Sequence, residues 1–296
     1  MSIVVVGATG QLARSLNDSY ASVSDSPVFV GREQLDVRHL DAIPMLLDEL
    51  QPTILINATA YTAVDLAERD REAAFFVNTK APAGMALWSA RNDCKFVHIS
   101  TDYVFDGDLG RPYTELHCAK PLNHYGQTKR DGEKAVLDVS GNSLIFRTSW
   151  LHSPYGKNFL TTMLDLATKR DSLRIVSDQF GNPTCALDLA DTIKAAVSPL
   201  NGPELSGLYH ASSVGGTSWS GFAESIFSLA LQYNLLKRVP ELEPIPSSEF
   251  PTPADRAKDT RLACSLLAEK GLSLPGWKLG AQRTIATIAK RKREAQ

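Results

Sequence analysis

The chain has 296 residues, of which 43% are hydrophobic and 22% are charged, and its formal net charge is −2. This composition is typical of a globular protein built as one large α/β domain or two unequal domains. The weak net charge argues against nucleic acid or an acidic membrane as a partner. The apolar runs are of strand length, well short of the roughly 20 residues that span a bilayer.

The cysteines and histidines lie apart in the sequence and form none of the familiar metal-binding patterns. The four cysteines make no C-x-x-C pair, and the six histidines make no H-x-H or H-E-x-x-H pattern. We therefore expect the cysteines to be small apolar fillers in a reducing cytoplasm, and we expect no catalytic metal. The chain runs straight into a strand without a basic leader, which argues against a signal peptide.

Strand and helix patterns alternate through the first half of the chain. The run "IVVVG" at 3–7 is apolar without alternation, which is typical of a parallel strand buried on both faces. Further strands are expected at 28–31, 53–60, 95–100 and 143–149, and helices at 11–20, 39–50, 70–92 and 125–138. This order predicts a Rossmann-type, doubly wound parallel sheet in an NAD(P)-binding domain over residues 1–150.

The pattern loosens after residue 150, where prolines, glycines and serines become frequent. Short strands are expected at 173–176 and 207–212, and helices at 158–170, 187–197, 219–232 and 260–270. We interpret residues 151–296 mainly as a smaller substrate-binding domain, with some elements returning to the sheet. The basic tail "KRKREAQ" is interpreted as a solvated helix end.

A glycine loop follows the first strand. In "VVVGATGQLARSL", Gly7, Gly10 and Ala13 lie three residues apart between a buried strand and a helix. Glycines let the backbone turn tightly and approach a pyrophosphate, and the helix N-terminus adds partial positive charge. The position at the start of a βαβ series favours a dinucleotide site over a plain turn, and we expect Thr9 to contact the cofactor as well.

The end of the second strand bears on the choice between NADPH and NADH. Arg32 stands there, with Asp36 a few residues further on. An acidic side chain suits a free ribose, whereas an arginine suits a 2′-phosphate. Arg32 therefore favours NADPH, although its side chain could also stack on adenine or lie in solvent.

A tyrosine and a lysine are spaced for catalysis in "HYGQTKRDGEK" at 124–134. Tyr125 and Lys129 are four residues apart, so they lie on one face of a helix. A tyrosine can protonate a ketone that receives a hydride, and a neighbouring positive charge makes its proton more available. In the same helix, Asp131, Glu133 and Lys134 are interpreted as a solvated face.

Hydroxyl groups follow the fourth strand in "HISTDYVFDG". Ser100 and Thr101 fall at its carboxyl end, where open α/β sheets bind ligands. Such a hydroxyl could hold the oxygen of the substrate ketone. Ser-Thr-Asp after a strand can also form only a turn or a cap, but the placement beside a Tyr-Lys pair favours catalysis.

At this point the chain resembles the dTDP-4-dehydrorhamnose reductases, a family of extended short-chain dehydrogenase/reductases. The resemblance runs from residue 1 to about 280 and rests on motifs in the family's order. These are "GATGQLA", "NATAYTAVDLAE", "VNTKAP", "ISTDYVFDG", "YGQTK", "FRTSW", "DQFGNPT" and "FPTPADR".

The resemblance implies a role for each matching residue. Thr101, Tyr125 and Lys129 would form the catalytic triad, with Tyr125 as proton donor. The implied cofactor contacts are Gly10, Gln11 and Leu12 at the phosphates, Asp36 and Val37 near adenine, and Ala60, Tyr61 and Thr62 beside the nicotinamide half. The implied contacts of the dTDP-sugar are Thr101, Asp102, Trp150 and, at the diphosphate, Arg256.

Some of these residues have plainer interpretations, and the chain departs from the family in places. Trp150 could be a core aromatic and Arg256 a surface arginine. Alanine follows Arg256 where the family commonly has proline. Some members join two subunits through magnesium held by glutamates, but here those positions are Ser15 and Leu187. We therefore expect a monomer or a weak homodimer.

The function expected from these features is reduction of the C4 ketone of dTDP-4-dehydro-6-deoxy-L-mannose to dTDP-L-rhamnose by NADPH or NADH. A reductase of a related dTDP-4-ketosugar is a close alternative, because pocket shape sets the stereochemistry. The family resemblance also extends to the regulatory subunit of methionine adenosyltransferase, which is not catalytic. The intact triad and "FRTSW" argue against that alternative.

Overall fold

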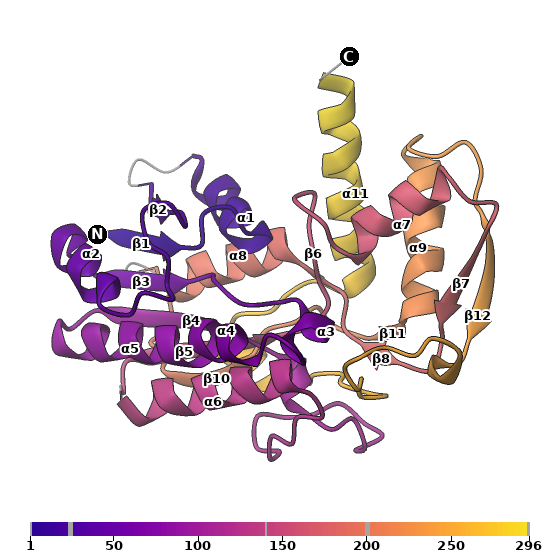
Figure 1. Ribbon diagram of the computed structural model, residues 1–296. Helices are drawn as coiled ribbons and strands as arrows, with labels where there is room; N and C mark the ends of the chain where they lie inside the picture. The colour runs from indigo at the N-terminus through magenta and orange to yellow at the C-terminus, as the bar shows by residue number, and fades with distance from the viewer. Residues whose placement is uncertain (1, 23–25, 140, 199–201, 295–296) are drawn as a thin grey trace.

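The computed structural model describes residues 2–22, 26–139, 141–198 and 202–294. Six parallel strands form the central sheet, in the order β10-β5-β4-β3-β1-β2 (Figure 1). They are β1 (Ile3–Val6), β2 (Val28–Val30), β3 (Ile54–Asn57), β4 (Lys95–Thr101), β5 (Ser143–Thr148) and β10 (Gly207–His210). The predicted α/β class is confirmed, and the strand order reverses beside β1, where such sheets bind ligands.

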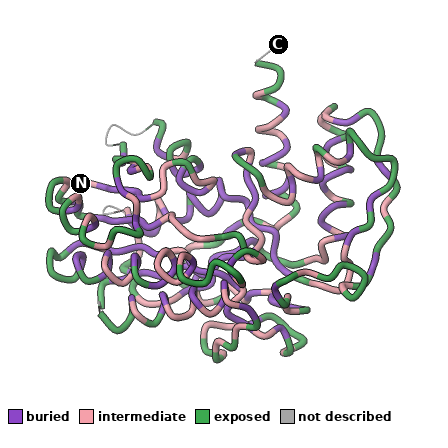
Figure 2. Tube along the Cα trace, viewed as in Figure 1, coloured by how far each residue is buried: buried purple, intermediate pink, exposed green. Residues whose placement is uncertain are grey.

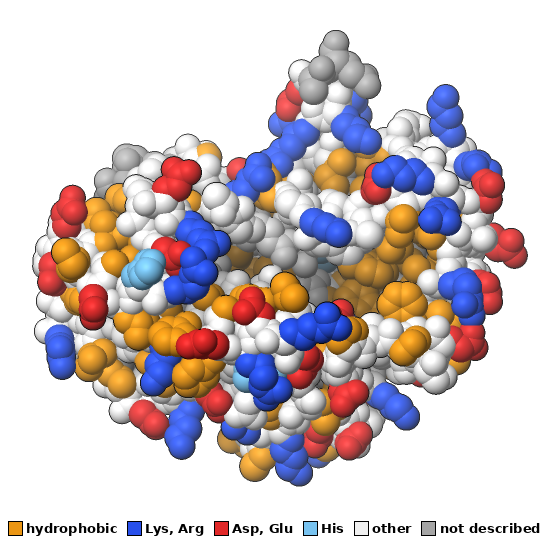
Figure 3. Space-filling model, in the orientation of Figure 1, with side chains coloured by type: hydrophobic (Ala, Val, Ile, Leu, Met, Phe, Trp, Pro, Cys, Tyr) orange, Lys and Arg blue, Asp and Glu red, His pale blue; other side chains and the backbone are white. Residues whose placement is uncertain are grey.

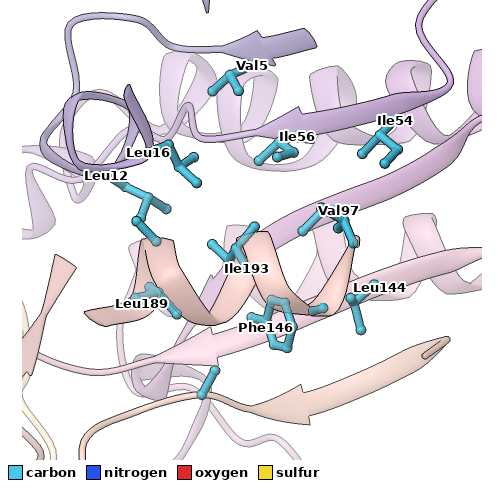
Figure 4. Close-up of a cluster of buried hydrophobic side chains, with 14 of the residues drawn as sticks. Val5, Leu12, Leu16, Ile54, Ile56, Val97, Leu144, Phe146, Leu189 and Ile193 are labelled. Atoms are coloured by element: carbon cyan, nitrogen blue, oxygen red, sulfur yellow. The ribbon is translucent and has the colours of Figure 1, made fainter. Parts of the chain in front are cut away.

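Helices cover both faces of this sheet. One face carries α1 (Gln11–Tyr20) and α8 (Ala186–Ala196), and the other carries α2 (Ala42–Leu50), α5 (Ala81–Arg91) and α6 (His124–Val139). Figure 4 shows Leu16 of α1 and Ile193 of α8 gathered with Val5, Ile56 and Val97 of the strands, and Leu12 extending from α1 towards α8. Every residue of β1, β3 and β5 is buried, which explains why their sequences show no alternation.

A second, smaller cluster of apolar side chains lies beside the sheet. It is built from α7 (Phe159–Ala167), α9 (Trp219–Gln232) and α11 (Trp277–Glu294), with the parallel pair β7 (Ser172–Val176) and β12 (Glu241–Ile245). The buried segments of Figure 2 follow both clusters. The last turns of α11 project from the body of the molecule (Figure 1).

Short elements connect these parts. They are the helices α3 (Val64–Ala67), α4 (Arg71–Phe75) and α10 (Ser265–Glu269), the π-helix η1 (Phe76–Lys80), the 3₁₀ turns η2 (Asp102–Val104) and η3 (Ser247–Glu249), and the strands β6 (Leu151–His152), β8 (Phe180–Gly181), β9 (Thr184–Cys185) and β11 (Thr217–Ser218). The helix predicted over 70–92 is the succession α4, η1 and α5. The π-helical turn ends at Lys80, two residues before Pro82, whose ring and missing N–H disturb regular helix geometry.

Two predicted helices begin too early. The helix expected over 260–270 is wrong in its first half, because that backbone pairs with Tyr113: Tyr113 N–H donates to Arg261 O and Ala263 N–H donates to Tyr113 O, both at 2.7 Å. Only 265–269 is helical. The helix expected over 39–50 begins at Ala42, and Pro44 lies in its first turn, where no intrahelical N–H bond is lost.

Candidate active site

Two adjoining cavities lie at the carboxyl ends of the central strands. Their volumes are about 500 and 440 Å³, and both are lined by Gly10, Ala58, Thr59 and Ala60. Figure 3 shows the molecule hollowed between the sheet and the smaller cluster, with hydrophobic side chains in the wall and Lys and Arg on the rim. We call the first the nucleotide cavity and the second the reaction cavity.

The glycine loop separates the two cavities. Gly7 has φ +109°, a backbone conformation that favours glycine. A Cβ there would also stand 3.0 Å from the Ala58 carbonyl, so both the backbone conformation and the lack of space exclude a side chain. Gly10 is the N-cap of α1, whose first turn carries no acidic residue. Thr9 lines the nucleotide cavity, and Gln11 and Leu12 line the reaction cavity. The open backbone and the bare helix N-terminus fit a pyrophosphate.

Several charged side chains border the nucleotide cavity. Arg32, Asp36, Val37 and Arg38 all line it. Asp36 accepts hydrogen bonds from Arg38 Nε at 2.9 Å and Arg32 Nε at 3.3 Å. The Arg38 guanidinium is the main reason that the pKa of Asp36 lies well below its usual value. Sequence reasoning missed Arg38, although it stands only two residues after Asp36.

The segment after β3 is shared between the cavities. Ala60 lines both, Tyr61 lines the nucleotide cavity and Thr62 lines the reaction cavity. The Tyr61 hydroxyl donates to Asp70 at 3.0 Å. The three residues that the resemblance places beside the nicotinamide half are thus distributed over the two cavities.

The three predicted catalytic residues, Thr101, Tyr125 and Lys129, line the reaction cavity together. Thr101 ends β4, and the other two lie on α6. A close approach brings the helix to this point: a Cβ on Gly126 would stand 2.1 Å from the Tyr103 carbonyl oxygen. The glycine therefore lets α6 press against η2.

Burial dominates the electrostatics of the two residues on α6. It raises the pKa of Tyr125 well above the ordinary value, and the Thr101 hydroxyl opposes that rise. Burial also lowers the pKa of Lys129 to about 8, with Glu133 acting in the opposite direction. Lys129 Nζ donates to Ile99 O at 2.6 Å and lies 3.2 Å from Nε2 of His98. Sequence reasoning did not find His98.

Glu133 is buried, so the predicted solvated face is wrong at this position. Only 3% of Glu133 is exposed, and its carboxylate accepts from Arg147 Nε at 2.8 Å and Nη2 at 2.6 Å. The Ser100 hydroxyl also donates to this carboxylate. Ser100 is thereby committed to the ion pair. The Thr101 hydroxyl accepts from the Tyr103 N–H and donates to Asp102, both at 3.2 Å, so it also caps η2, as the plainer interpretation of this segment expected. Lys134 is exposed, as expected.

Two predicted substrate residues, Asp102 and Trp150, also line the reaction cavity. Asp102 is buried and accepts from Ser149 at 2.9 Å and Thr260 at 2.5 Å, and burial raises its pKa to about 6. Trp150 has φ +44° and stacks face to face on Trp219, with 3.4 Å between ring centroids. Trp219, which the sequence did not single out, also lines the cavity.

Arg256 does not line the reaction cavity itself. Its side chain is 22% exposed and is held by Asp65 of α3. Together with Tyr103 and Trp150, it lines a small recess beside the reaction cavity. Its predicted diphosphate contact stays a prediction. Asn182, in contrast, ties backbone segments together: its amide donates to Ser213 O and accepts from Leu262 N–H.

The positions where some relatives carry metal-binding glutamates are buried in this chain. Ser15 is 0% exposed and Leu187 is 6% exposed. Within the described ranges, no three His, Cys, Asp or Glu side chains gather as a metal site. No helix among those residues is long and apolar enough to cross a membrane.

The fold and the two cavities define an NAD(P)-dependent oxidoreductase of the short-chain dehydrogenase/reductase type. The chain belongs to the RmlD family, since the model of the "RmlD substrate binding domain" matches residues 1–290.

Named relatives extend this result. A dTDP-4-dehydrorhamnose reductase of Burkholderia thailandensis is 41% identical, over 94% of this chain and 96% of its own. The crystal structure of a dTDP-4-dehydrorhamnose reductase from Bacillus anthracis in complex with NADP is 33% identical. It superposes with a TM-score of 0.90 over 97% of this chain and 100% of its own. A protein of Streptomyces antibioticus named "Probable dTDP-4,6-dihydroxy-2-methyloxan-3-one 4-ketoreductase" is 39% identical, over 77% of each chain.

Proposed function

We propose that the protein reduces the C4 ketone of dTDP-4-dehydro-6-deoxy-L-mannose to give dTDP-L-rhamnose, using NADPH or NADH. One observation carries the proposal: Thr101, Tyr125 and Lys129 line a single cavity with Trp150, directly beside the glycine loop. That arrangement supplies a cofactor site, a proton donor and an aromatic wall within one recess.

The bound cofactor supplies the hydride that reaches C4. Tyr125 then gives its phenolic proton to the C4 oxygen, and the Thr101 hydroxyl holds that oxygen in place. Because burial makes the phenol of Tyr125 a weak acid, a positive charge on Lys129 is needed to make the proton available. In this proposal Lys129 also binds the nicotinamide ribose.

Trp150, Trp219, Asp102 and Arg256 hold the sugar nucleotide in this proposal. The stacked rings of Trp150 and Trp219 offer a flat apolar surface for the base. Asp102 is a buried acceptor for sugar hydroxyls, and Arg256 offers its guanidinium to the diphosphate.

The direct test mixes the protein with the dTDP-ketosugar and NADPH, and separately with NADH, and follows the absorbance of the reduced nicotinamide at 340 nm. We expect oxidation with both cofactors and a product that co-migrates with dTDP-L-rhamnose. Absence of oxidation with either cofactor, in a protein that binds both, would contradict the proposal.

A second candidate is reduction of a related dTDP-4-ketosugar, which the likeness to the Streptomyces antibioticus protein favours. The same assay, repeated with the related ketosugar, distinguishes the two, because the physiological substrate should give the higher kcat/KM. A cytoplasmic location and a monomer or weak homodimer stay predictions. Sedimentation velocity, with and without magnesium and EDTA, would measure the oligomeric state.

A further inference from the structure

The side-chain nitrogen of Lys129 faces a histidine beneath the reaction cavity. His98 is fully buried on β4, and only 1% of Lys129 is exposed. The 3.2 Å between Lys129 Nζ and His98 Nε2 is a hydrogen-bonding distance, but a ring nitrogen can either donate or accept. The other side of the imidazole ring decides which of these His98 does.

Asn57 fixes the tautomer of His98. The Asn57 side-chain oxygen accepts from the Thr59 backbone N–H at 3.0 Å and from the Thr59 hydroxyl at 2.6 Å. Because a backbone N–H only donates, the amide oxygen must face Thr59. The amide nitrogen then faces His98 Nδ1, 3.2 Å away. An amide nitrogen also only donates, so Nδ1 accepts and the single ring proton of a neutral imidazole lies on Nε2.

We propose that His98 is a positioning residue that presents an N–H to Lys129 and thereby favours the uncharged amine. In this arrangement Nε2–H donates to the lone pair of Nζ, and Nζ in turn donates to Ile99 O. An ammonium group has no lone pair, so its N–H would face the ring N–H at 3.2 Å.

The other charged and titratable groups around Lys129 do not remove this effect of His98 on the charge of the amine. On α6, Tyr125 precedes Lys129 by one turn and Glu133 follows it by one turn. The carboxylate of Glu133 favours the ammonium form, but it is already paired with Arg147 of β5. Burial outweighs Glu133, and the pKa of Lys129 falls to about 8. Its charge therefore changes within the pH range of ordinary assays.

This gives His98 an effect on the reaction. Tyr125 releases its proton most readily beside a charged Lys129, so turnover should decline as pH rises and Lys129 loses its proton to solvent. His98 moves that decline to lower pH by stabilising the uncharged amine. The inference rests on the proposed function only in giving Lys129 a part in the chemistry.

Nuclear magnetic resonance can test the inference without substrate or turnover. In protein labelled with ¹⁵N-histidine, we expect the His98 ring to carry its proton on Nε2 throughout the pH range in which the protein is folded. In protein labelled at lysine ¹³Cε, the Lys129 signal, identified by its loss in Lys129→Met, should titrate near pH 8. A proton on Nδ1, or an ammonium group that persists above about pH 10, would overturn the proposal.

A substitution at Asn57 tests the link between the tautomer and the charge. In Asn57→Asp, a carboxylate oxygen would accept from Nδ1, so the ring proton should move there and Nε2 should accept from Lys129. We expect the pKa of Lys129 to rise by about one unit, a tenfold change in its protonation equilibrium. The new charge also acts directly, so the same substitution is made in the His98→Phe background as a control.

In that background we expect less than half of the shift, since no tautomer remains to be changed. Equal shifts in both backgrounds would show that His98 plays no part. The measurements on the unsubstituted protein stand even where a variant fails to fold. They are also independent of the substrate, so a failure here is distinguishable from a failure of the proposed function.

Discussion

Arg256, which lines the recess, and Asp65 form a bidentate ion pair between residues 191 positions apart in the chain. Nη1 lies 3.0 Å from Oδ1 and Nη2 lies 2.9 Å from Oδ2. The guanidinium lowers the pKa of Asp65. A diphosphate that binds Arg256 must therefore share it with Asp65 or displace Asp65.

Arg256→Ala is expected to raise the KM for the sugar nucleotide by about 10- to 100-fold, the loss typical of hydrogen bonds to a charged group. Turnover at saturation should change less, because Arg256 lies away from the reacting atoms. Asp65→Asn is the matched variant: it frees the guanidinium and should leave the KM unchanged or lower it. Steady-state kinetics measure both, and an unchanged KM in Arg256→Ala would remove the diphosphate contact.

Tyr125→Phe removes only a hydroxyl from the reaction cavity. We expect turnover to fall by at least about 100-fold, as is typical when general acid catalysis is lost. Cofactor affinity, measured by quenching of tryptophan fluorescence, should stay within about twofold, because the ring and the helix remain. Tyr20→Phe is the control, since it removes another buried tyrosine hydroxyl outside both cavities. Turnover in Tyr125→Phe equal to that of the control would reject the proton-donor role.

Asp102 should make stability depend on pH. Its pKa is raised from 3.8 to about 6 in the folded protein, so between these values the folded state holds more protons than the unfolded state. Stability should therefore fall as pH rises from about 4 to 6, with a cost of about 3 kcal/mol at pH 7.

Asp102→Asn should remove this dependence and stabilise the protein at pH 7 by about 1–3 kcal/mol. It should also weaken substrate binding. Urea denaturation at pH 4.5 and pH 7 measures the effect on stability. A variant that is less stable than the original at pH 7 would contradict the argument, since it would mean that the hydrogen bonds to the carboxylate outweigh its burial.

The architecture and part of the site follow local patterns that can be read from the sequence. The buried strands, the glycine loop and the spacing of Tyr125 and Lys129 each lie within one short segment. The burial of Glu133 could not be found in this way, because it depends on Arg147, a residue of another element. The same holds for the stacking of Trp150 on Trp219 and for the tautomer that Asn57 imposes on His98. Such contacts arise only when the chain has folded.

The Glu133–Arg147 pair should be important for stability, because each side chain would be an unpaired buried group without the other. Glu133→Gln is expected to destabilise the protein by about 3–5 kcal/mol, the usual cost of removing one partner of a buried ion pair. Asp131→Asn, on the same helix but partly exposed, should cost less than about 1 kcal/mol. Thermal or urea denaturation compares the two. Equal effects would mean that the buried pair makes no special contribution.

Arg38 and Arg32 should together determine the preference for NADPH. Both line the nucleotide cavity and both contact Asp36, so they surround the position where a ribose 2′-substituent would lie if adenosine occupies this cavity. Asp36 alone would favour a free 2′-hydroxyl and repel a phosphate, whereas the two guanidinium groups reverse the sign of the local charge. Arg38 makes the closer contact, so its loss should matter more.

We expect Arg38→Ala to weaken NADPH binding by about tenfold, since one charge-assisted contact to a phosphate is lost. NADH binding should change less than about threefold, because NADH has no 2′-phosphate. Arg32→Ala should show the same pattern to a smaller degree, as its side chain is 71% exposed and screened by solvent. Titration of each variant with the two cofactors gives the ratio directly. A parallel loss of affinity for NADPH and NADH would assign the arginines to the adenine ring or the pyrophosphate and would leave the preference to other residues.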